Sequence, residues 1–337
     1  MSWPAITIIC GAALLLAAFL IYIYRFEPVN FGLTDTRINI STGKAGKKEE
    51  KLLTILHLSD FHLRRTFKGR RLFDFIGTLK SEEYDLIFIT GDMVENTSDA
   101  DYLAEMLSPL RARHGKYAVL GVHDYYNKAF YEFARNMFRR KKSYRGANDI
   151  GELSKKLKTV GIEILCNESK ILKTAGMGIG DIEIIGLDDP VIDKLDLKRA
   201  FREIDHLKEG EIIDGSSYRE ISSELFDMDG MRTHRLNREG HLRLALLHTP
   251  DSHVLATLHK KDVDIVFSGH THGGQVRLPL IGAIISGCRI KTAFASGLFY
   301  LKKMVLFISR GLGEGKYSQF RCYCPPEAVR ISIYRTD

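Results

Sequence analysis

Cysteine is scarce in this sequence, and its arrangement excludes two ways of cross-linking a fold. The chain has five cysteines, an odd number, and no Cys-x-x-Cys pair, so neither a disulfide framework nor a paired-cysteine zinc site is expected. Internal repeats and low-complexity tracts are also absent. With 45% hydrophobic and 27% charged residues over 337 positions, the chain can bury a sizeable core, as one large domain or one domain with insertions.

Charge is absent from the first 24 residues, where Ala5 to Tyr24 form an uncharged apolar run. Its length is about what a helix needs to cross a bilayer core, and Trp3 and Tyr22 suit the two interfaces. No Lys or Arg precedes the run and no small-residue cleavage site follows it, which argues against a cleaved secretory signal. We expect a transmembrane anchor at 5–24, a linker at 25–50 and one globular domain with insertions at 51–337.

Positive charge dominates the rest of the chain. All of the net charge of +7 follows Tyr24, because no charged side chain precedes Arg25. The positive-inside rule therefore places the domain on the cytoplasmic side of a single-pass membrane protein, and the unpaired cysteines agree. A basic domain at a membrane favours anionic lipids or phosphorylated substrates. Nucleic acid would suit the charge equally, but we expect no nucleic-acid partner and predict no protein partner.

Short β-rich runs recur from residue 52 to the end of the chain. Strands are expected at 52–58, 86–90, 117–120, 162–166, 182–185, 242–247, 265–268, 304–309 and 329–334. Helix-like stretches separate the early strands, and the later strands follow one another more directly. This order predicts an α/β sandwich of mixed sheets, with insertions at about 127–150 and 201–240.

The first insertion contains an amphipathic stretch at 129–142. Its apolar side chains recur at helical spacing, at Phe130, Phe133, Ala134, Met137 and Phe138, with arginine and lysine elsewhere around it. Such a helix could cover acyl chains and meet lipid headgroups. An ordinary surface helix with a solvated basic face has the same spacing, and both readings stay open.

Metal-binding side chains follow four separate apolar strands. They are Asp60 and His62, Asp92, His248, and the pair His270 and His272. Within each pair the residues stand at i and i+2, so in an extended chain they share a face. Each motif alone is weak, since Asp-x-His recurs by chance and Gly-Asp is an ordinary turn, but the ordered set is not. Carboxylate with imidazole suits manganese, iron or zinc, and two such ions can promote phosphoryl displacement.

The ordered set resembles the calcineurin-like metallophosphoesterases. The matching motifs are Asp60-x-His62, Gly91-Asp92, Gly121-x-His123-Asp124, His248 and Gly269-His270-x-His272. "GHTHGGQ", "SRGLG" and "PPE" are similar to the membrane-anchored branch, which includes a UDP-2,3-diacylglucosamine pyrophosphatase of lipid A synthesis. The resemblance implies a four-layer α/β/β/α sandwich of two mixed sheets and a centre of two divalent ions, manganese first, with iron or zinc as alternatives.

Roles for individual residues follow from the resemblance. One ion would be held by Asp60, His62 and His272. Asp92 would bridge to a second ion, which His248 and His270 would complete. His123 would lie over the phosphate, where it stabilises charge or protonates the leaving oxygen, and Asp124 would orient it.

Two positions depart from the family pattern. Glu95 stands where the family often has Asp, a mild change. Val122 stands where the family normally has a metal-binding Asn, and valine has no donor atom. We expect weaker affinity at the second site and retained activity, because the other ligand positions are all filled.

The substrate is inferred from the anchor and the rim. We expect hydrolysis of the pyrophosphate of UDP-2,3-diacylglucosamine, a nucleotide-linked lipid, to UMP and 2,3-diacylglucosamine 1-phosphate. The basic run 64–71 would hold a pyrophosphate or a nucleotide, or would be a solvated loop. Two alternatives remain: a broad-specificity or nucleotide phosphodiesterase with the anchor as a tether, and a catalytically impaired membrane scaffold with a degenerate second metal site.

Overall fold

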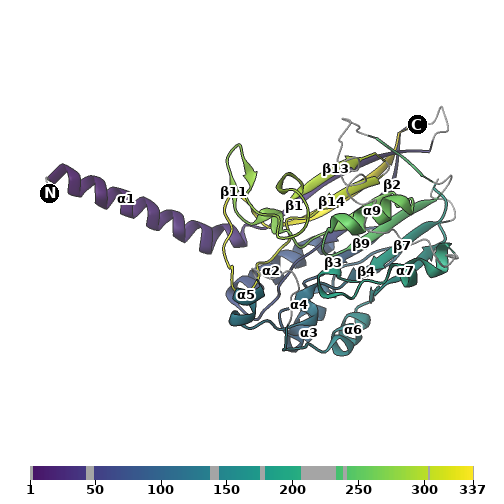
Figure 1. Cartoon of the computed structure of the whole chain (residues 1–337), viewed down its shortest axis with the longest axis horizontal. Coiled ribbons are helices and arrows are strands. Elements are labelled where there is room, and N and C mark those ends of the chain that lie inside the picture. Colours follow the sequence, from purple (N-terminus) through teal and green to yellow (C-terminus); the bar gives the residue numbers. More distant parts are fainter. Residues whose placement is uncertain are drawn as a thin grey trace.

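The computed structural model describes residues 3–42, 49–136, 144–174, 179–205, 233–237, 241–302 and 304–336. The chain begins with helix α1 (Trp3–Ile21), which projects away from the rest of the molecule (Figure 1). A π-helical turn (Tyr22–Phe26) and a 3-10 turn (Glu27–Val29) continue it. In the described part of the chain this is the one helix long and apolar enough to cross a membrane, and only 6% of its most apolar window is buried.

Two mixed sheets form the body of the domain. The first has the order β5 (Ile162–Ile164), β4 (Lys116–Val119), β3 (Leu86–Thr90), β2 (Glu50–Leu58), β15 (Glu327–Arg335), β1 (Gly32–Ser41) and β8 (His234–Arg235). The second has the order β13 (Gly297–Leu301), β14 (Met304–Ile308), β10 (Ile265–Ser268), β9 (Leu242–Leu247), β7 (Ile182–Leu187) and β6 (Glu168–Leu172). Each sheet combines parallel and antiparallel neighbours, which confirms the predicted mixed sheets.

Apolar side chains hold the sheets together and carry helices on their outer faces. Between the sheets, Phe88 of β3 and Phe267 of β10 pack with their rings 5.1 Å apart. Helices α2 (Phe67–Thr78), α3 (Ala100–Leu107) and α6 (Ile150–Thr159) cover the outer face of the first sheet. Helices α7 (Leu197–Asp205) and α9 (Ser252–Lys260) cover that of the second. The result is the expected four-layer α/β/β/α sandwich.

Strand direction places the anchor and the strand ends together. Strand β15 runs antiparallel to β2, and β1 runs parallel to β15. Strand β1 therefore begins at the edge of the sheet where β2 ends. Because α1 leads into β1, the root of the anchor lies at the end of the sandwich where the carboxyl ends of β2 and β3 lie.

The expected linker at 25–50 is wrong. Its residues 32–41 form β1, of which 32–40 pair with β15, and its first residues contact the domain. Arg321 N donates to Ile23 O at 3.1 Å, and Cys324 N donates to Glu27 Oε1 at 2.5 Å. Strand β1 escaped prediction because only two of its apolar side chains, Ile38 and Ile40, are fully buried, and polar residues fill the positions around them.

The predicted insertions lie only partly in the described residues. Within 129–142, α5 (Phe130–Asn136) is helical, and residues 137–143 lie outside the described part of the chain. Of 201–240, the structure describes the end of α7 and residues 233–237, which include β8. Strands β6 and β13 are additional to the predicted set, and both are edge strands with half-exposed side chains.

Candidate metal centre

The six predicted ligands converge at one end of the sandwich. Asp60 and His62 follow β2, Asp92 follows β3, His248 follows β9, and His270 and His272 follow β10. Carboxyl ends of parallel strands meet at one edge of a sheet, so residues far apart in the sequence become neighbours there. The side chains form two groups whose ligand atoms lie within 4.8 Å of one another: Asp60, His62 and His272, and Asp92, His248 and His270.

Asp92 lies between the two groups. Its Oδ2 is 3.3 Å from Nε2 of His248 in the second group and 3.7 Å from Nε2 of His62 in the first. Its other oxygen, Oδ1, accepts a hydrogen bond of 2.8 Å from the backbone N–H of His123, which fixes the carboxylate. This is the geometry of a ligand shared by two ions.

The hydrogen bonds of the histidines leave lone pairs facing each other. His62 donates from Nδ1 to Glu95 (2.9 Å), and His272 donates from Nδ1 to Gly313 O (3.0 Å). Their remaining nitrogens, both Nε2, lie 3.2 Å apart. A neutral imidazole that donates from one nitrogen has only a lone pair on the other, so this approach is repulsive unless one ring is protonated or a metal ion lies between them.

The second group repeats the pattern. His248 donates from Nδ1 to Thr90 O (2.7 Å), and His270 directs Nε2 at Gly287 O (3.4 Å). This leaves Nε2 of His248 and Nδ1 of His270, which lie 3.3 Å apart. Histidines held by protein acceptors on one nitrogen, with the other aimed at a shared point, are typical metal ligands. The donor sets therefore fit two divalent cations.

The backbone at the ligands is strained. Positive φ angles occur at Asp60 (52°), His62 (43°), Asp92 (49°), His270 (70°) and His272 (49°). Non-glycine residues rarely adopt this region, and its cost of about 1–3 kcal/mol each is tolerated mainly at functional sites. Gly91, at a φ of 74°, also has no room for a side chain, because a Cβ there would meet His248 Nδ1 at 2.5 Å. Strain at five of the six ligands is a signal that no sequence pattern could give.

Electrostatics also favour positive charge in the centre. Burial alone would lower the pKa of His248, but Asp92 and Asp60 raise it well above its ordinary value. The carboxylates thus require a cation, which a protonated histidine or a metal ion can supply.

His123 lies beside the two groups, as predicted, but Asp124 does not orient its ring. His123 is in the one-turn helix α4 (Val122–Tyr125), and its Nε2 lies 4.0 Å from Oδ2 of Asp92. The buried carboxylate of Asp124 instead accepts from the backbone N–H groups of Met93 (2.7 Å) and Gly121 (2.9 Å). Asp124 therefore ties the loop after β3 to the turn before α4.

Glu95 performs the role that was expected of Asp124. Its Oε2 accepts from Nδ1 of His123 at 3.0 Å, and its Oε1 accepts from His62. Burial would raise the pKa of Glu95, but the two histidines hold it well below its usual range. One hint was available in the sequence, since Glu95 follows Asp92 by three residues, but only the fold brings Glu95 to both rings.

Val122 is buried, and neighbouring positions leave little space around the second group. A Cβ on Gly121 would meet Asp92 Oδ1 at 2.3 Å. Because valine has no donor atom, Val122 offers no side-chain ligand, and the residues of the second group that could hold an ion are Asp92, His248 and His270.

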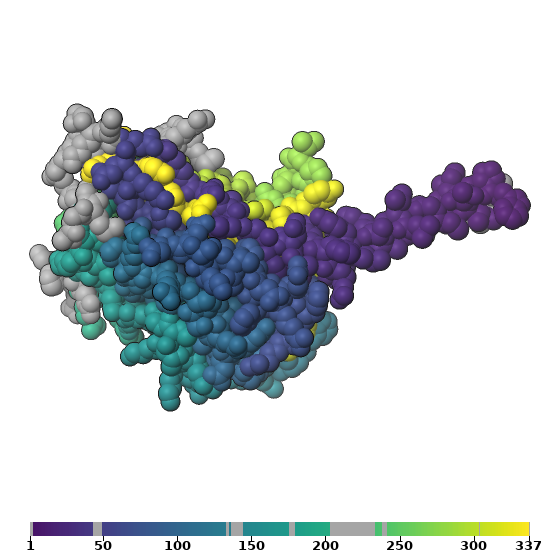
Figure 2. Space-filling view, turned by 180° about the vertical axis from the view of Figure 1, so that it is seen from behind, coloured from purple at the N-terminus to yellow at the C-terminus, as the bar shows by residue number. Residues whose placement is uncertain are grey.

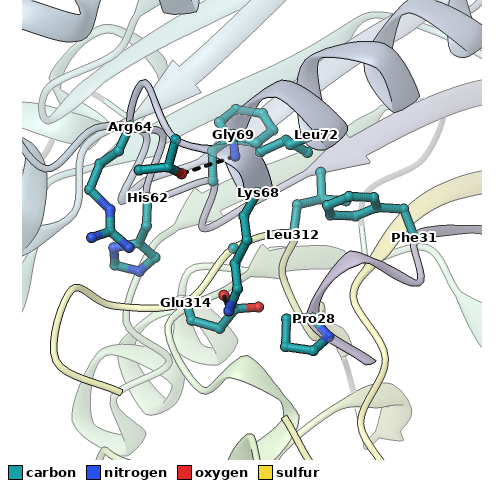
Figure 3. A pocket seen from close by; sticks show the side chains of 12 residues that line it. Pro28, Phe31, His62, Arg64, Lys68, Gly69, Leu72, Leu312 and Glu314 are labelled. Atoms are coloured by element: carbon teal, nitrogen blue, oxygen red, sulfur yellow. Dashed lines mark hydrogen bonds and ion pairs between the residues drawn. The ribbon is translucent and has the colours of Figure 1, made fainter. Parts of the chain in front are cut away.

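Part of the basic run 64–71 reaches the centre. A small cavity is lined by His62, Arg64, Lys68 and Glu314, together with apolar residues (Figure 3). Lys68 pairs there with Glu314 at 3.4 Å, whereas the buried Nε of Arg64 has no hydrogen-bond partner. Figure 3 shows the Arg64 guanidinium on the His62 side of this cavity. The exposed Arg65 instead lies over the ring of Tyr102.

Comparison with known proteins agrees with this geometry. Residues 53–274, well over half of the chain, match the family described as Calcineurin-like phosphoesterase. The matched segment contains all six ligands of the two groups, together with Glu95, His123 and Asp124.

Three curated relatives match most of the chain. The uncharacterized metallophosphoesterase YkoQ of Bacillus subtilis is 26% identical over 89% of this chain and 92% of its own length. The phosphodiesterase YaeI of Escherichia coli is 24% identical over 93% of this chain and 92% of its own length. The UDP-2,3-diacylglucosamine pyrophosphatase LpxG of Chlamydia muridarum is 25% identical over 82% of both chains.

Proposed function

Because this chain belongs to the calcineurin-like phosphoesterases and is thus a metal-dependent hydrolase, we propose that it cleaves a phosphoric anhydride in a membrane-embedded substrate. The observation that carries the proposal is the shared position of the metal centre and the anchor root at one end of the sandwich. A substrate with its phosphates just above the bilayer would meet the centre there.

Asp60, His62 and His272 would hold one ion, and Asp92 would bridge to a second ion held by His248 and His270. Manganese is the proposed metal, with iron and zinc also compatible with the donor set. When bound, such ions polarise the phosphate and neutralise the charge that develops on its oxygens. Deprotonated Asp92 and neutral His272, which donates from Nδ1 to Gly313 O, are already in the form that binds metal, whereas His248 would release its Nε2 proton when an ion binds.

The chain's own residues supply positioning and proton transfer. Glu95 fixes the His123 ring so that Nε2 faces the centre, where it would contact a phosphoryl oxygen. Burial lowers the pKa of His123 to about 4, so the ring would take up a proton from water at Nε2 as the negative phosphate binds, and it would then pass this proton to the leaving oxygen. Asp124 holds the loops that carry Asp92 and His123 at the required spacing. Arg64 would donate to the second phosphate of a pyrophosphate, because its buried Nε has no other acceptor.

The proposed substrate is UDP-2,3-diacylglucosamine, and the products are UMP and 2,3-diacylglucosamine 1-phosphate. Support comes from the relative named for this activity, from α1, and from the exposed aromatic residues Phe130 and Tyr131 of α5. We also propose that the domain is cytoplasmic and that α1 anchors it in a bacterial inner membrane, since basic residues follow the apolar run.

A phosphodiesterase of broader specificity is the second candidate, and the relative YaeI favours it. The two candidates differ in their need for acyl chains. The full chain in detergent would be assayed for UMP release from UDP-2,3-diacylglucosamine and from UDP-glucosamine, and for cleavage of bis(p-nitrophenyl) phosphate. Preference for the acylated compound supports the proposal, whereas equal rates on all three support the phosphodiesterase. No turnover of any of the three compounds under any metal, with the first group occupied and the second group empty, would favour the scaffold.

A further inference from the structure

An apolar hairpin stands beside the metal centre with its aliphatic side chains in solvent. Strands β11 (Arg277–Leu278) and β12 (Gly282–Ala283) form it, and the segment from 278 to 288 contains no charged residue. The exposed side chains are Leu278 (42%), Leu280 (108%), Ile281 (73%), Ile284 (51%) and Ile285 (66%). Single exposed aliphatic residues are common, but a contiguous group at a protruding tip marks an interaction surface.

The base of the hairpin is firmly attached to the domain. Gln275 donates from Nε2 to Phe320 O (2.7 Å), and Arg277 N donates to Cys322 O (2.9 Å). Ala283 of the returning strand is buried against Gly274, where a Cβ would meet it at 2.5 Å. The tip therefore projects from an ordered base.

The same segment of chain holds the root of the anchor. The backbone N–H groups of Arg321 and Cys324 donate to Ile23 O and Glu27 Oε1 at the root of α1. The carbonyls of Phe320 and Cys322, in the same segment, accept the hydrogen bonds from the base of the hairpin. Figure 1 shows β11 and the root of α1 at the same end of the molecule. In Figure 2 the light-green hairpin stands above the surface next to the point where α1 leaves it.

Positive charge borders the apolar tip. Arg277 precedes it, and the exposed side chains of Arg289 and Lys291 follow it. An apolar tip bordered by basic residues suits a membrane whose headgroups are anionic. This charge pattern, with the position beside α1, favours lipid over a protein partner or a second copy of the chain.

We propose that residues 278–285 insert into the leaflet from which α1 emerges and seat the metal centre at the bilayer surface. The hairpin starts five residues after the ligand His272, and its returning limb contacts the ligand His270 through Gly287 O. Insertion at this point places the two ligands next to the headgroups. The inference rests on the proposed membrane location of α1, and it is independent of the chemistry of the substrate.

Fluorescence quenching tests the insertion directly. Trp3 is the only tryptophan in the chain, so Trp3→Phe combined with Leu280→Trp carries a single reporter at the tip. The full chain would be reconstituted into vesicles whose lipids are brominated on the acyl chain. Strong quenching is expected at the tip and none in the control, Trp3→Phe with Ile171→Trp. Ile171 is 44% exposed and lies on β6, the edge strand of the second sheet opposite to β13. Equal quenching in both, or none at the tip, would overturn the proposal.

A charge at the tip tests the functional consequence. Leu280 has a φ of 68°, which aspartate tolerates better than leucine, so Leu280→Asp with Ile281→Asp does not strain the hairpin. Turnover of the lipid substrate in vesicles is expected to fall about tenfold, and turnover of soluble bis(p-nitrophenyl) phosphate to stay unchanged. Ile171→Asp is the matched control. Equal turnover of vesicle lipid by the variant and the control would contradict the proposal. If the protein cleaves neither compound, the proposed function fails, and the quenching result still decides the hairpin.

Discussion

Glu95 Oε2 lies 3.0 Å from Nδ1 of His123, the residue expected to assist the leaving group. The second oxygen of the same carboxylate binds Nδ1 of the ligand His62 at 2.9 Å. One buried carboxylate therefore orients both the proposed metal ligand His62 and His123, the histidine proposed to face the substrate. This connection makes Glu95 a positioning residue.

Replacing Glu95 should affect both histidines. In Glu95→Gln the amide retains the shape but loses the charge, and kcat and metal affinity should each fall about 10–100-fold, the usual range for such supporting residues. Glu95→Asp, which restores the charge with a shorter reach, should recover part of the loss. The measurements are kcat on a soluble phosphodiester and calorimetric binding of Mn²⁺. Wild-type values for Glu95→Gln in both would show that the contacts to the rings have no functional role.

Val122 should limit the second metal site. Val122→Asn supplies a side-chain oxygen at the start of α4, and the weaker of two Mn²⁺ affinities should tighten by about tenfold. Val122→Leu is the matched control, because it changes volume without adding a donor atom. Unchanged Mn²⁺ affinity and turnover in Val122→Asn would show that this position does not face the second ion.

Arg64 should bind the pyrophosphate and not the metal. Removing a charged hydrogen bond costs about 1.5–3 kcal/mol, so Arg64→Gln should lower kcat/KM for a pyrophosphate substrate by about 10–100-fold. Mn²⁺ affinity should stay at the wild-type value. Arg65→Gln is the control, since Arg65 is exposed and lies on Tyr102. Similar losses in the two variants would remove the assigned role.

We expect the buried His57 to lower the free energy of unfolding in acid, independently of the proposed metal ligands. It is buried between the sheets, against Phe267 and Phe307, and burial lowers its pKa from 6.5 to about 3. As the pH falls, His57 takes up a proton in the unfolded chain near pH 6.5 but in the folded chain only near pH 3. The contribution of neutral His57 to the free energy of unfolding is therefore complete above pH 6.5 and is lost as the pH falls toward 3. The slope from this group alone reaches about 1.4 kcal/mol per pH unit.

The measurement is urea unfolding of the metal-free full chain in detergent micelles at several pH values. His57→Phe keeps the ring volume and removes the titrating group. As the pH falls below 6.5, the free energy of unfolding of the wild type should therefore decrease more steeply than that of His57→Phe. Parallel pH profiles would contradict the assignment.

The sequence was most informative where a continuous apolar strand ends in a ligand. Strands β2, β3, β9 and β10 are buried on both faces, so their apolar runs stand out, and their ligands occupy the next residues. Strand β1 has no continuous apolar run, because it lies next to the short edge strand β8 and most of its side chains are at least partly exposed.

Roles that depend on loop geometry could not be predicted. Asp124 follows His123 directly, yet its carboxylate turns to backbone groups near Met93, and Glu95 reaches the ring from the neighbouring strand end. Sequence proximity therefore suggested the wrong partner. The strained backbone at five ligands and the facing lone pairs of the histidines are likewise properties of the folded chain alone.

The central claim is a working centre of two metal ions that acts on a membrane lipid. The most direct measurement is UMP release from UDP-2,3-diacylglucosamine by the full chain in vesicles while Mn²⁺ is titrated onto metal-free protein, with Asp92→Asn in parallel. The account predicts that release appears as two ions bind per chain and is abolished in Asp92→Asn. No release with two ions bound, or equal release by Asp92→Asn, would contradict it.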